Sequence, residues 1–385
     1  MKRLFVTGLG CLSALGNDRH AFAAGLRNAT AGIGPLTAFD ASGLTVRIAG
    51  EVRGFDPAAH FEKSRLGQMD RFAQLAVVSA REAVAHSGLT IDDTLAPRIA
   101  VVHGTGAGGQ LTQDDSYRLL YGENAKRLHP FTVPKLMPSA GPSQVSMDLG
   151  ITGPVFGTTS ACASSGHAIA MGALLLRAGL ADVALVGGAE AALTFGSLKG
   201  WESLRVMAHD TCRPFSQGRG GMVLGEGAGT LVLETEDHAR ARGARPLAEL
   251  AGLGTNCDGL HVTAPSEPGM RGAMELSLAD AELSPDDIDY VNAHGTSTPL
   301  GDELEFGAVK RLFGPAAANV KMSSTKSAIG HLLGAAGSAE AIFSILAMRD
   351  GVVPPTLNLD NPSDDCQGID LVPHAAKEMK VRAAL

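Results

Sequence analysis

The chain of 385 residues has 45% hydrophobic and 19% charged side chains, a balance typical of a well-packed globular protein. Its length exceeds what a single hydrophobic core usually serves, so two domains or two fused halves are expected. The formal net charge of −8 argues against general nucleic-acid binding. No apolar run reaches the roughly 18 residues needed to cross a bilayer, so no membrane span is expected.

The N-terminus and the cysteines both indicate a reducing compartment. Residues 1–8 lack the apolar stretch of a signal peptide and predict a first strand that enters a turn. The five cysteines are scattered without any CxxC pair, at Cys11, Cys162, Cys212, Cys257 and Cys366. This pattern is typical of a cytoplasmic protein with free thiols rather than of a disulfide framework.

The first half alternates predicted strands and helices. Strands are predicted at residues 4–7, 46–48, 98–103, 151–156, 181–187 and 230–234, and helices at 20–26, 70–87 and after Cys162. Residues 104–109 form a glycine-rich loop without the Gly-Lys-Ser/Thr ending of a phosphate-binding loop. We therefore interpret this loop as one that admits close packing or an acyl chain.

Residues 158–172, with the sequence TTSACASSGHAIAMG, predict a tight turn of small residues that leads into a buried helix. Cys162 is expected at or near the first turn of this helix. Unpaired N–H groups and the helix dipole favour an anion there, so the thiol should ionise more easily and act as a nucleophile. The alternative is a structural cysteine packed against Ala and Gly.

The second half repeats the order of elements. Strands are predicted at 247–254, 288–292, 320–322 and 369–372, and helices at 270–281, 304–312 and 339–348. No sequence repeat marks the two halves. The repeated order of elements nevertheless suggests two similar α/β units that share one core.

Two histidines follow predicted strands of the second half. His294 lies in the turn NAHGTSTPLGD, just beyond the carboxyl end of a strand, where α/β folds place functional side chains. His331 ends the stretch SSTKSAIGH, five residues after Lys326. One such histidine is usually structural, but two of them with a helix-capping cysteine provide the set of groups needed for acyl transfer.

The Cys162 stretch, the turn at residues 292–296 and the Lys326 to His331 motif resemble those of the β-ketoacyl-acyl carrier protein synthases, most closely the type II condensing enzymes. The resemblance runs from residues 5–10 to residues 354–362. It implies a thiolase-like α/β fold, with two similar βα halves in five layers (αβαβα). The expected halves are residues 1–236, with the nucleophile, and residues 237–385, with both histidines.

The resemblance also implies the catalytic roles. Cys162 would carry the acyl group as a thioester, and His294 and His331 would donate hydrogen bonds during the decarboxylation of malonyl-carrier. Lys326 would orient His331, with Glu340 as its partner, unless it forms only a simple surface ion pair. The implied reaction is the decarboxylative Claisen condensation of acyl-carrier with malonyl-carrier to 3-oxoacyl-carrier and CO2, in fatty-acid biosynthesis.

Acyl carrier protein is the implied partner, its phosphopantetheine the only prosthetic group, and a homodimer the expected assembly. The resemblance places Thr296, Thr298 and Trp201 near the pantetheine arm or the entrance, and Ala107 in the acyl tunnel. The expected carrier-docking residues are basic: Lys63, Arg65, Lys126, Arg127 and Arg205.

Members of the family continue beyond the equivalent of residues 382–385 into a strand and a Gly-Phe-Gly-Gly-Thr-Asn loop with a second oxyanion donor. On this ground we expect the chain to be C-terminally incomplete and to condense poorly. The alternatives are a ketosynthase of a specialised lipid, nodulation-factor or polyketide pathway, and a non-catalytic chain-length-factor partner. A thiolase, a type III synthase and a Cys/His zinc site are disfavoured by the residue types and their spacing.

Overall fold

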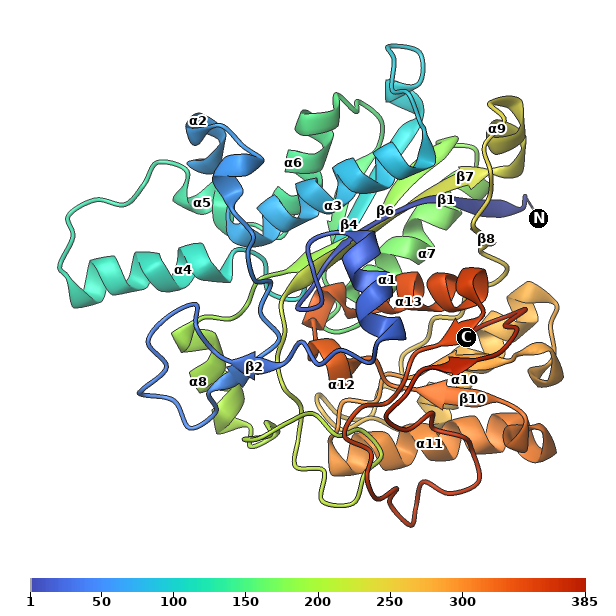
Figure 1. The fold of residues 1–385 in the computed structure, drawn as a ribbon. Coiled ribbons are helices and arrows are strands. Elements are labelled where there is room, and N and C mark those ends of the chain that lie inside the picture. The colour runs from blue at the N-terminus through green and yellow to red at the C-terminus, as the bar shows by residue number, and fades with distance from the viewer. Residues whose placement is uncertain (1) are drawn as a thin grey trace.

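The computed structural model describes residues 2–385, and five of the six strands of its largest sheet come from the first half of the chain, residues 1–236 (Figure 1). The strand order is β5 (Val155–Thr158), β4 (Ile99–Gly104), β6 (Val183–Glu190), β7 (Gly227–Thr235), β1 (Leu4–Leu12) and β8 (Ala248–Glu249). Strand β4 is parallel to β5 and β6, whereas β7 and β1 are antiparallel to their neighbours. Every residue of β1, β4, β6 and β7 is buried, as expected for strands covered on both faces.

Helices cover both faces of this sheet, and a second sheet with helices on its far side completes five layers (Figure 1). Helices α3 (Arg71–Ser87) and α6 (Ala140–Leu149) cover the outer face, and α7 (Ser164–Arg177) and α13 (Ala336–Asp350) the inner face. A second sheet of β9 (Tyr290–Asn292) and β10 (Lys321–Ser323) packs beyond α13, and α10 (Glu267–Ala281) and α11 (Pro299–Phe313) cover its far side. The thiolase-like αβαβα arrangement expected from the sequence is confirmed.

The second sheet has shorter and fewer strands than the sequence predicted. β9 and β10 pair in parallel from Tyr290 opposite Lys321 to Asn292 opposite Ser323. The predicted strand at 369–372 is wrong: only a single bridge links Asp370 to Lys321, and Val372 has φ 49°, which interrupts the extended conformation. At the other edge, the N–H of Asn292 donates to the carbonyl of residue 385 at 2.8 Å.

The predicted strand at 247–254 is also wrong beyond its first residues. Only β8 pairs with β1, and the chain then runs along α10, where the N–H of Leu253 donates to Asp280 Oδ2 at 2.9 Å. The predicted strand at 46–48 is a two-residue strand, β3 (Ile48–Ala49), paired with β2 (Gly34–Pro35). The helices predicted at 20–26, 70–87, 270–281, 304–312 and 339–348 are present within a few residues.

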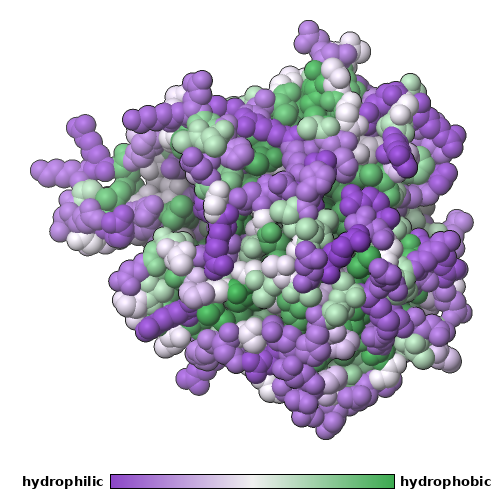
Figure 2. All heavy atoms as spheres, viewed as in Figure 1, coloured by the Kyte–Doolittle hydropathy of each residue, from purple (hydrophilic) through white to green (hydrophobic). Residues whose placement is uncertain are grey.

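The remaining elements are short. Apart from 3-10 turns of three to five residues, they are α1 (Arg19–Arg27), α2 (Lys63–Leu66), α4 (Gln110–Tyr117), the π-helix η3 (Arg118–Gly122), α5 (Thr132–Leu136), α8 (Phe195–Ser203), α9 (Glu236–Ala241), α12 (Lys326–Ile329), β11 (Val352–Val353) and β12 (Lys377–Glu378). Helix α4 and the loop that leads to α5 project from one side of the body as an arm (Figure 1). The surface seen in Figure 2 is mainly hydrophilic, with hydrophobic patches between the hydrophilic residues. Across residues 2–385, no helix combines the length and apolar character required to cross a membrane.

Candidate active site

Cys162 lies in a strained turn between β5 and α7. The preceding residue, Ala161, has φ 51°, a left-handed conformation that costs a side-chain-bearing residue roughly 1–2 kcal/mol. Ser164, the first residue of α7, holds this turn: its N–H and its hydroxyl both contact the Ala161 carbonyl, at 3.2 and 2.7 Å. The helix therefore begins two residues after the cysteine, so Cys162 precedes the first helical turn rather than lying within it.

His331 is the nearest polar side chain to this thiol. Its Nε2 lies 3.0 Å from Cys162 Sγ, while its Nδ1 accepts the N–H of Leu333 at 3.2 Å. Because Nδ1 accepts a hydrogen bond, a neutral imidazole must carry its proton on Nε2. The imidazole therefore donates toward the sulfur, and this nitrogen cannot take a proton from the thiol.

His294 completes the cluster from the second half of the chain. Its ring lies 5.2 Å from that of His331, centroid to centroid, at an interplanar angle of 87°. The polar side-chain atoms of Cys162, His294 and His331 all lie within 4.8 Å of one another. Glu305 on α11 holds the turn that contains His294, because it accepts the N–H groups of His294 and Gly295 at 2.6 Å each.

Lys326 forms the ion pair with Glu340 that the resemblance implied, and the simple surface pair is excluded because Lys326 is only 1% exposed. Burial lowers the pKa of His331 well below its usual range, and the charge of Lys326 adds to this effect. Desolvation, followed by Lys326, likewise lowers the pKa of His294. Both imidazoles are consequently neutral hydrogen-bond donors at physiological pH.

The acidity of the Cys162 thiol differs from the prediction. Burial raises the pKa of Cys162, and the positive charge of Lys326 opposes that rise. The expectation of an easily ionised thiol at a helix N-terminus is therefore not supported. The physical reason is that Cys162 precedes α7 and is largely shielded from water, and this loss of hydration disfavours the thiolate.

The zinc-site interpretation was disfavoured because the candidate ligands come from separate turns, yet folding brings one cysteine and two histidines together. The Leu333 N–H nevertheless determines their chemistry. A metal would need the lone pair of His331 Nε2, and in the observed arrangement this nitrogen carries the proton.

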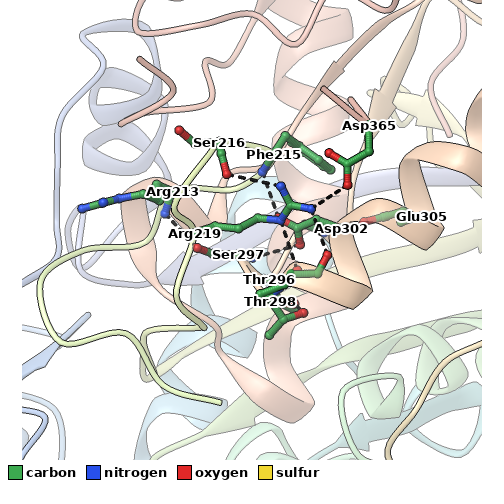
Figure 3. Close-up of polar contacts among 12 residues, drawn as sticks. Arg213, Phe215, Ser216, Arg219, Thr296, Ser297, Thr298, Asp302, Glu305 and Asp365 are labelled. Carbon is green, nitrogen blue, oxygen red and sulfur yellow. Dashed lines mark hydrogen bonds and ion pairs between the residues drawn. The ribbon is translucent and has the colours of Figure 1, made fainter. Parts of the chain in front are cut away.

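Sequence reasoning missed a buried polar cluster behind the His294 turn (Figure 3). Asp302, on α11, accepts the N–H groups of Ser297 at 3.0 Å and Phe215 at 2.9 Å. Arg219 bridges Asp302 at 3.7 Å and Asp365 at 3.0 Å. Burial raises the pKa of Asp302 to about 7. The sequence signal that could have revealed this cluster is the pair of carboxylates Asp302 and Glu305, three residues apart on the helix that directly follows the His294 motif.

The residues predicted to contact substrate lie on two sides of the site. The hydroxyls of Thr296 and Thr298 are 3.0 Å apart and lie below Asp302 in the view of Figure 3. Ala107 and Trp201 pack in an apolar cluster that also contains Leu333, two residues from His331. The same cluster includes Leu193, which borders a cavity of about 910 Å³ between α4 and residues 37–54.

The predicted docking residues divide into two kinds. Arg65 is held by Asp148 at 2.6 Å and by Gln144 at 3.2 Å, so it contributes to the packing of α2 on α6. The other four are exposed and form no ion pair with any residue between 2 and 385: Lys63, Lys126, Arg127 and Arg205.

Comparisons with known proteins agree with this geometry. The N-terminal and C-terminal domain models of β-ketoacyl synthases match residues 1–239 and 247–360. The chain is 46% identical to nodulation protein E of Rhizobium sp. (strain N33), covering 100% of this chain and 95% of that protein. It is 42% identical to 3-oxoacyl-[acyl-carrier-protein] synthase 2 of Staphylococcus aureus (strain N315), covering 100% of this chain and 94% of that protein.

Solved structures show the same fold. The ishigamide ketosynthase/chain length factor superimposes with a TM-score of 0.95 at 33% identity, covering 100% of this chain and 94% of that chain. A β-ketoacyl synthase from Burkholderia phymatum STM815 gives a TM-score of 0.91 at 34% identity, covering 99% of this chain and 94% of that chain. The chain thus belongs to the β-ketoacyl synthase family and is a 3-oxoacyl-[acyl-carrier-protein] synthase-like acyltransferase.

Proposed function

We propose that the protein condenses an acyl-carrier with malonyl-carrier, releasing CO2 and forming 3-oxoacyl-carrier. The observation that carries this proposal is the 3.0 Å contact between Cys162 Sγ and His331 Nε2, with His294 beside them. It sets a nucleophile against two neutral hydrogen-bond donors. A non-catalytic partner subunit would have no need for this arrangement.

In the first half-reaction, Cys162 attacks the thioester carbonyl of the acyl-carrier. The carrier thiol leaves with the cysteine proton, and the acyl group remains on Sγ as a thioester. The N–H of Cys162 is the candidate donor to the tetrahedral oxyanion. Because burial raises the pKa of the thiol, attack depends on proton loss as the carrier sulfur leaves rather than on a preformed thiolate.

In the second half-reaction, malonyl-carrier places its thioester oxygen between the two imidazoles. The bond to the carboxylate breaks, CO2 leaves, and the electron pair forms an enolate that is stabilised by donors on His294 and His331. The enolate carbon attacks the acyl-Cys162 carbonyl, the carbon–sulfur bond breaks, and Cys162 leaves as a thiolate that takes a proton from water. Neutral imidazoles suit this step because they donate hydrogen bonds without being acids strong enough to quench the carbanion.

A homodimer is the assembly that the surface supports. Strand β5 is an edge of the large sheet, and an uncovered edge strand is a template for association. Exposed apolar side chains gather on the projecting arm and the adjoining helices: Leu111, Tyr117, Tyr121, Phe131, Val133, Met137, Met147, Met171 and Leu174. Sedimentation equilibrium tests this assembly, and a monomer at micromolar concentration would contradict it.

The acidic carrier protein would dock on the four exposed basic residues, Lys63, Lys126, Arg127 and Arg205. Their charges are not neutralised by neighbours among residues 2–385, so they are available to steer an acidic partner. Membership of the family supports this choice of partner. One solved relative, 27% identical with a TM-score of 0.90, is a type II polyketide synthase acyl-carrier protein in complex with its ketosynthase.

A second candidate is the same reaction in a specialised lipid pathway. Four nodulation E proteins are 44–46% identical to the chain, against 41–42% for the Staphylococcus aureus synthases. Chain-length and unsaturation profiles with a panel of acyl-carriers distinguish the pathways. A broad preference for saturated chains supports primary fatty-acid synthesis, whereas a narrow preference for an unusual acyl group supports the specialised one.

The direct test is intact-mass analysis of the purified protein with acyl-carrier and then malonyl-carrier. The expected result is an acyl adduct that is absent in Cys162→Ala and that disappears as 3-oxoacyl-carrier forms. An adduct without product would refute condensation. No adduct at all would favour the non-catalytic partner subunit.

A further inference from the structure

Glu190, the last residue of β6, is a fully buried carboxylate that no step of the reaction uses. Its Oε2 accepts the N–H of Gly106 at 2.6 Å and of Gly334 at 2.9 Å. Its Oε1 accepts the Thr105 hydroxyl at 3.0 Å and the N–H of Ala107 at 3.2 Å. A single side chain therefore joins the glycine-rich loop after β4 to the turn that follows His331.

All four partners donate hydrogen bonds. An ionised carboxylate can only accept them, so the side chain of Glu190 suits this position. Burial raises the pKa of Glu190, and the hydrogen bonds from Gly106, Gly334, Thr105 and Ala107 oppose that rise. No other side-chain acceptor reaches the N–H of Gly334 among residues 2–385. The N–H of Gly334, in the turn after His331, is consequently held by this one side chain.

The two loops meet with no space between them. A Cβ added at Gly334 would lie 2.1 Å from the Gly106 nitrogen, and one added at Gly106 would lie 3.0 Å from Glu190 Oε2. The same Gly106 position is 3.7 Å from the carbonyl of Ala161, the strained residue before the nucleophile. The junction therefore lies directly beneath the Cys162 turn.

The anchored turn also contains the hydrogen bond that sets the His331 tautomer. Leu333 has φ 46°, a conformation that an L-residue adopts only when its surroundings enforce it. Its N–H donates to His331 Nδ1, and the next N–H in the chain, that of Gly334, is held by Glu190. Loss of the second hydrogen bond should therefore loosen the backbone that holds the first.

We infer that Glu190 is a positioning residue: it holds the Leu333–Gly334 turn so that His331 presents a protonated Nε2 to the reacting thioester. This inference rests on the condensation proposed above. Through Ala107, the same carboxylate also fixes one residue of the expected acyl tunnel to the histidine turn.

The test compares Glu190→Gln with Glu51→Gln. Glu51 is the matched control, because it is also a buried carboxylate but lies away from the cluster. It accepts the N–H groups of Thr37 and Ala38 and the Thr37 hydroxyl at 2.7–2.8 Å. In Glu190→Gln an amide NH2 must face N–H donors. Two readouts are needed: the separate rates of Cys162 acylation and malonyl-carrier decarboxylation, and the His331 tautomer from ¹⁵N-histidine NMR, with His331→Ala for assignment.

For Glu190→Gln we expect decarboxylation to fall roughly 10- to 100-fold, the scale of a small misplacement, while acylation changes by no more than about threefold. We also expect the NMR signal of a protonated Nδ1 to appear for His331. Glu51→Gln should show neither effect. A wild-type tautomer in Glu190→Gln, or equal losses in both half-reactions, would overturn the inference.

Two further results keep the test decisive. If Glu190→Gln does not fold, Gly106→Ala displaces the same carboxylate and is judged by the same readouts. If the wild-type protein acylates but never decarboxylates, the proposed condensation fails, and the tautomer measurement alone decides the role of Glu190.

Discussion

Replacing Lys326 by the near-isosteric Met separates the structural role of this cation from its role in the reaction. Lys326 is 1% exposed and its partner Glu340 15%, so the substitution leaves a carboxylate buried without its counter-charge. Breaking a buried ion pair by removing one partner typically costs about 3–5 kcal/mol. At roughly 2 °C per kcal/mol for a chain of this size, Tm should fall by about 6–10 °C.

The loss should depend on pH in a defined direction. Burial already raises the pKa of Glu340, and Lys326 is the group that opposes this rise. Without Lys326 the folded-state pKa rises further above the unfolded value. The variant is then closest to wild type in Tm at acidic pH, where Glu340 is protonated, and the difference grows as pH rises. Differential scanning calorimetry from pH 5 to 8 measures it.

Two control variants sharpen the result. Lys326→Met with Glu340→Leu removes both charges and should recover most of the lost Tm. Arg71→Met breaks a comparable partly buried pair with Glu226, at 2.8 Å, in a different part of the fold. Only the Lys326 variants should slow malonyl-carrier decarboxylation, on the order of 10²-fold, the usual loss when one electrostatic stabiliser of an oxyanion is removed.

Two outcomes would refute this reasoning. A wild-type Tm in Lys326→Met would show that the ion pair contributes nothing to the fold. Recovery of both Tm and decarboxylation in the double variant would show that Lys326 serves packing alone, with no influence on the imidazoles.

Three further predictions concern the acyl tunnel, the buried cluster and the nucleophile. Ala107→Phe should shorten the longest acyl-carrier that is elongated, measured by mass spectrometry of the products; an unchanged profile would exclude Ala107 from the tunnel. Burial raises the pKa of Asp302 to about 7, so the stability that it contributes is complete below its unfolded pKa near 4 and is lost as pH rises through 7. Asp302→Asn should therefore remove a fall in Tm between pH 4 and 7, and an identical pH profile in both proteins would contradict the assignment. Because burial raises the pKa of the Cys162 thiol, its alkylation by iodoacetamide in a Cys257→Ser background should still accelerate above pH 9; a plateau near neutrality would show a thiolate instead.

Much of the fold and the reacting side chains could be predicted because their signals are local. Helical periodicity marks α3, and turns of glycine and other small residues mark where Cys162, His294 and His331 leave their elements. The strand at 369–372 could not be excluded in the same way. Its residues suit a strand, and the left-handed Val372 that ends the pairing depends on packing against distant parts of the chain.

The acid–base state of the site was the least predictable part, because it depends on contacts between distant segments. The helix N-terminus after Cys162 suggested a reactive thiolate, but burial acts in the opposite direction and dominates. Nothing near His331 in sequence shows that Leu333 fixes its tautomer, since that hydrogen bond needs a backbone conformation few leucines adopt. Glu190 is 141 residues away from His331, and only folding brings it to the histidine turn.

The placement of the carboxylates explains how a site with several buried acids keeps its imidazoles neutral. An anion in direct contact with an imidazole would raise its pKa and favour the imidazolium, an acid strong enough to protonate an enolate carbon. Glu190 and Glu305 each bind backbone N–H groups instead, and Asp302 does the same with Arg219 beside it. Their charge is compensated by the backbone that they hold, so the same bonds that fix the turns also shield the two histidines. The cation of Lys326, although paired with Glu340, acts on both rings, and it lowers the pKa of each in the direction that keeps the imidazole neutral.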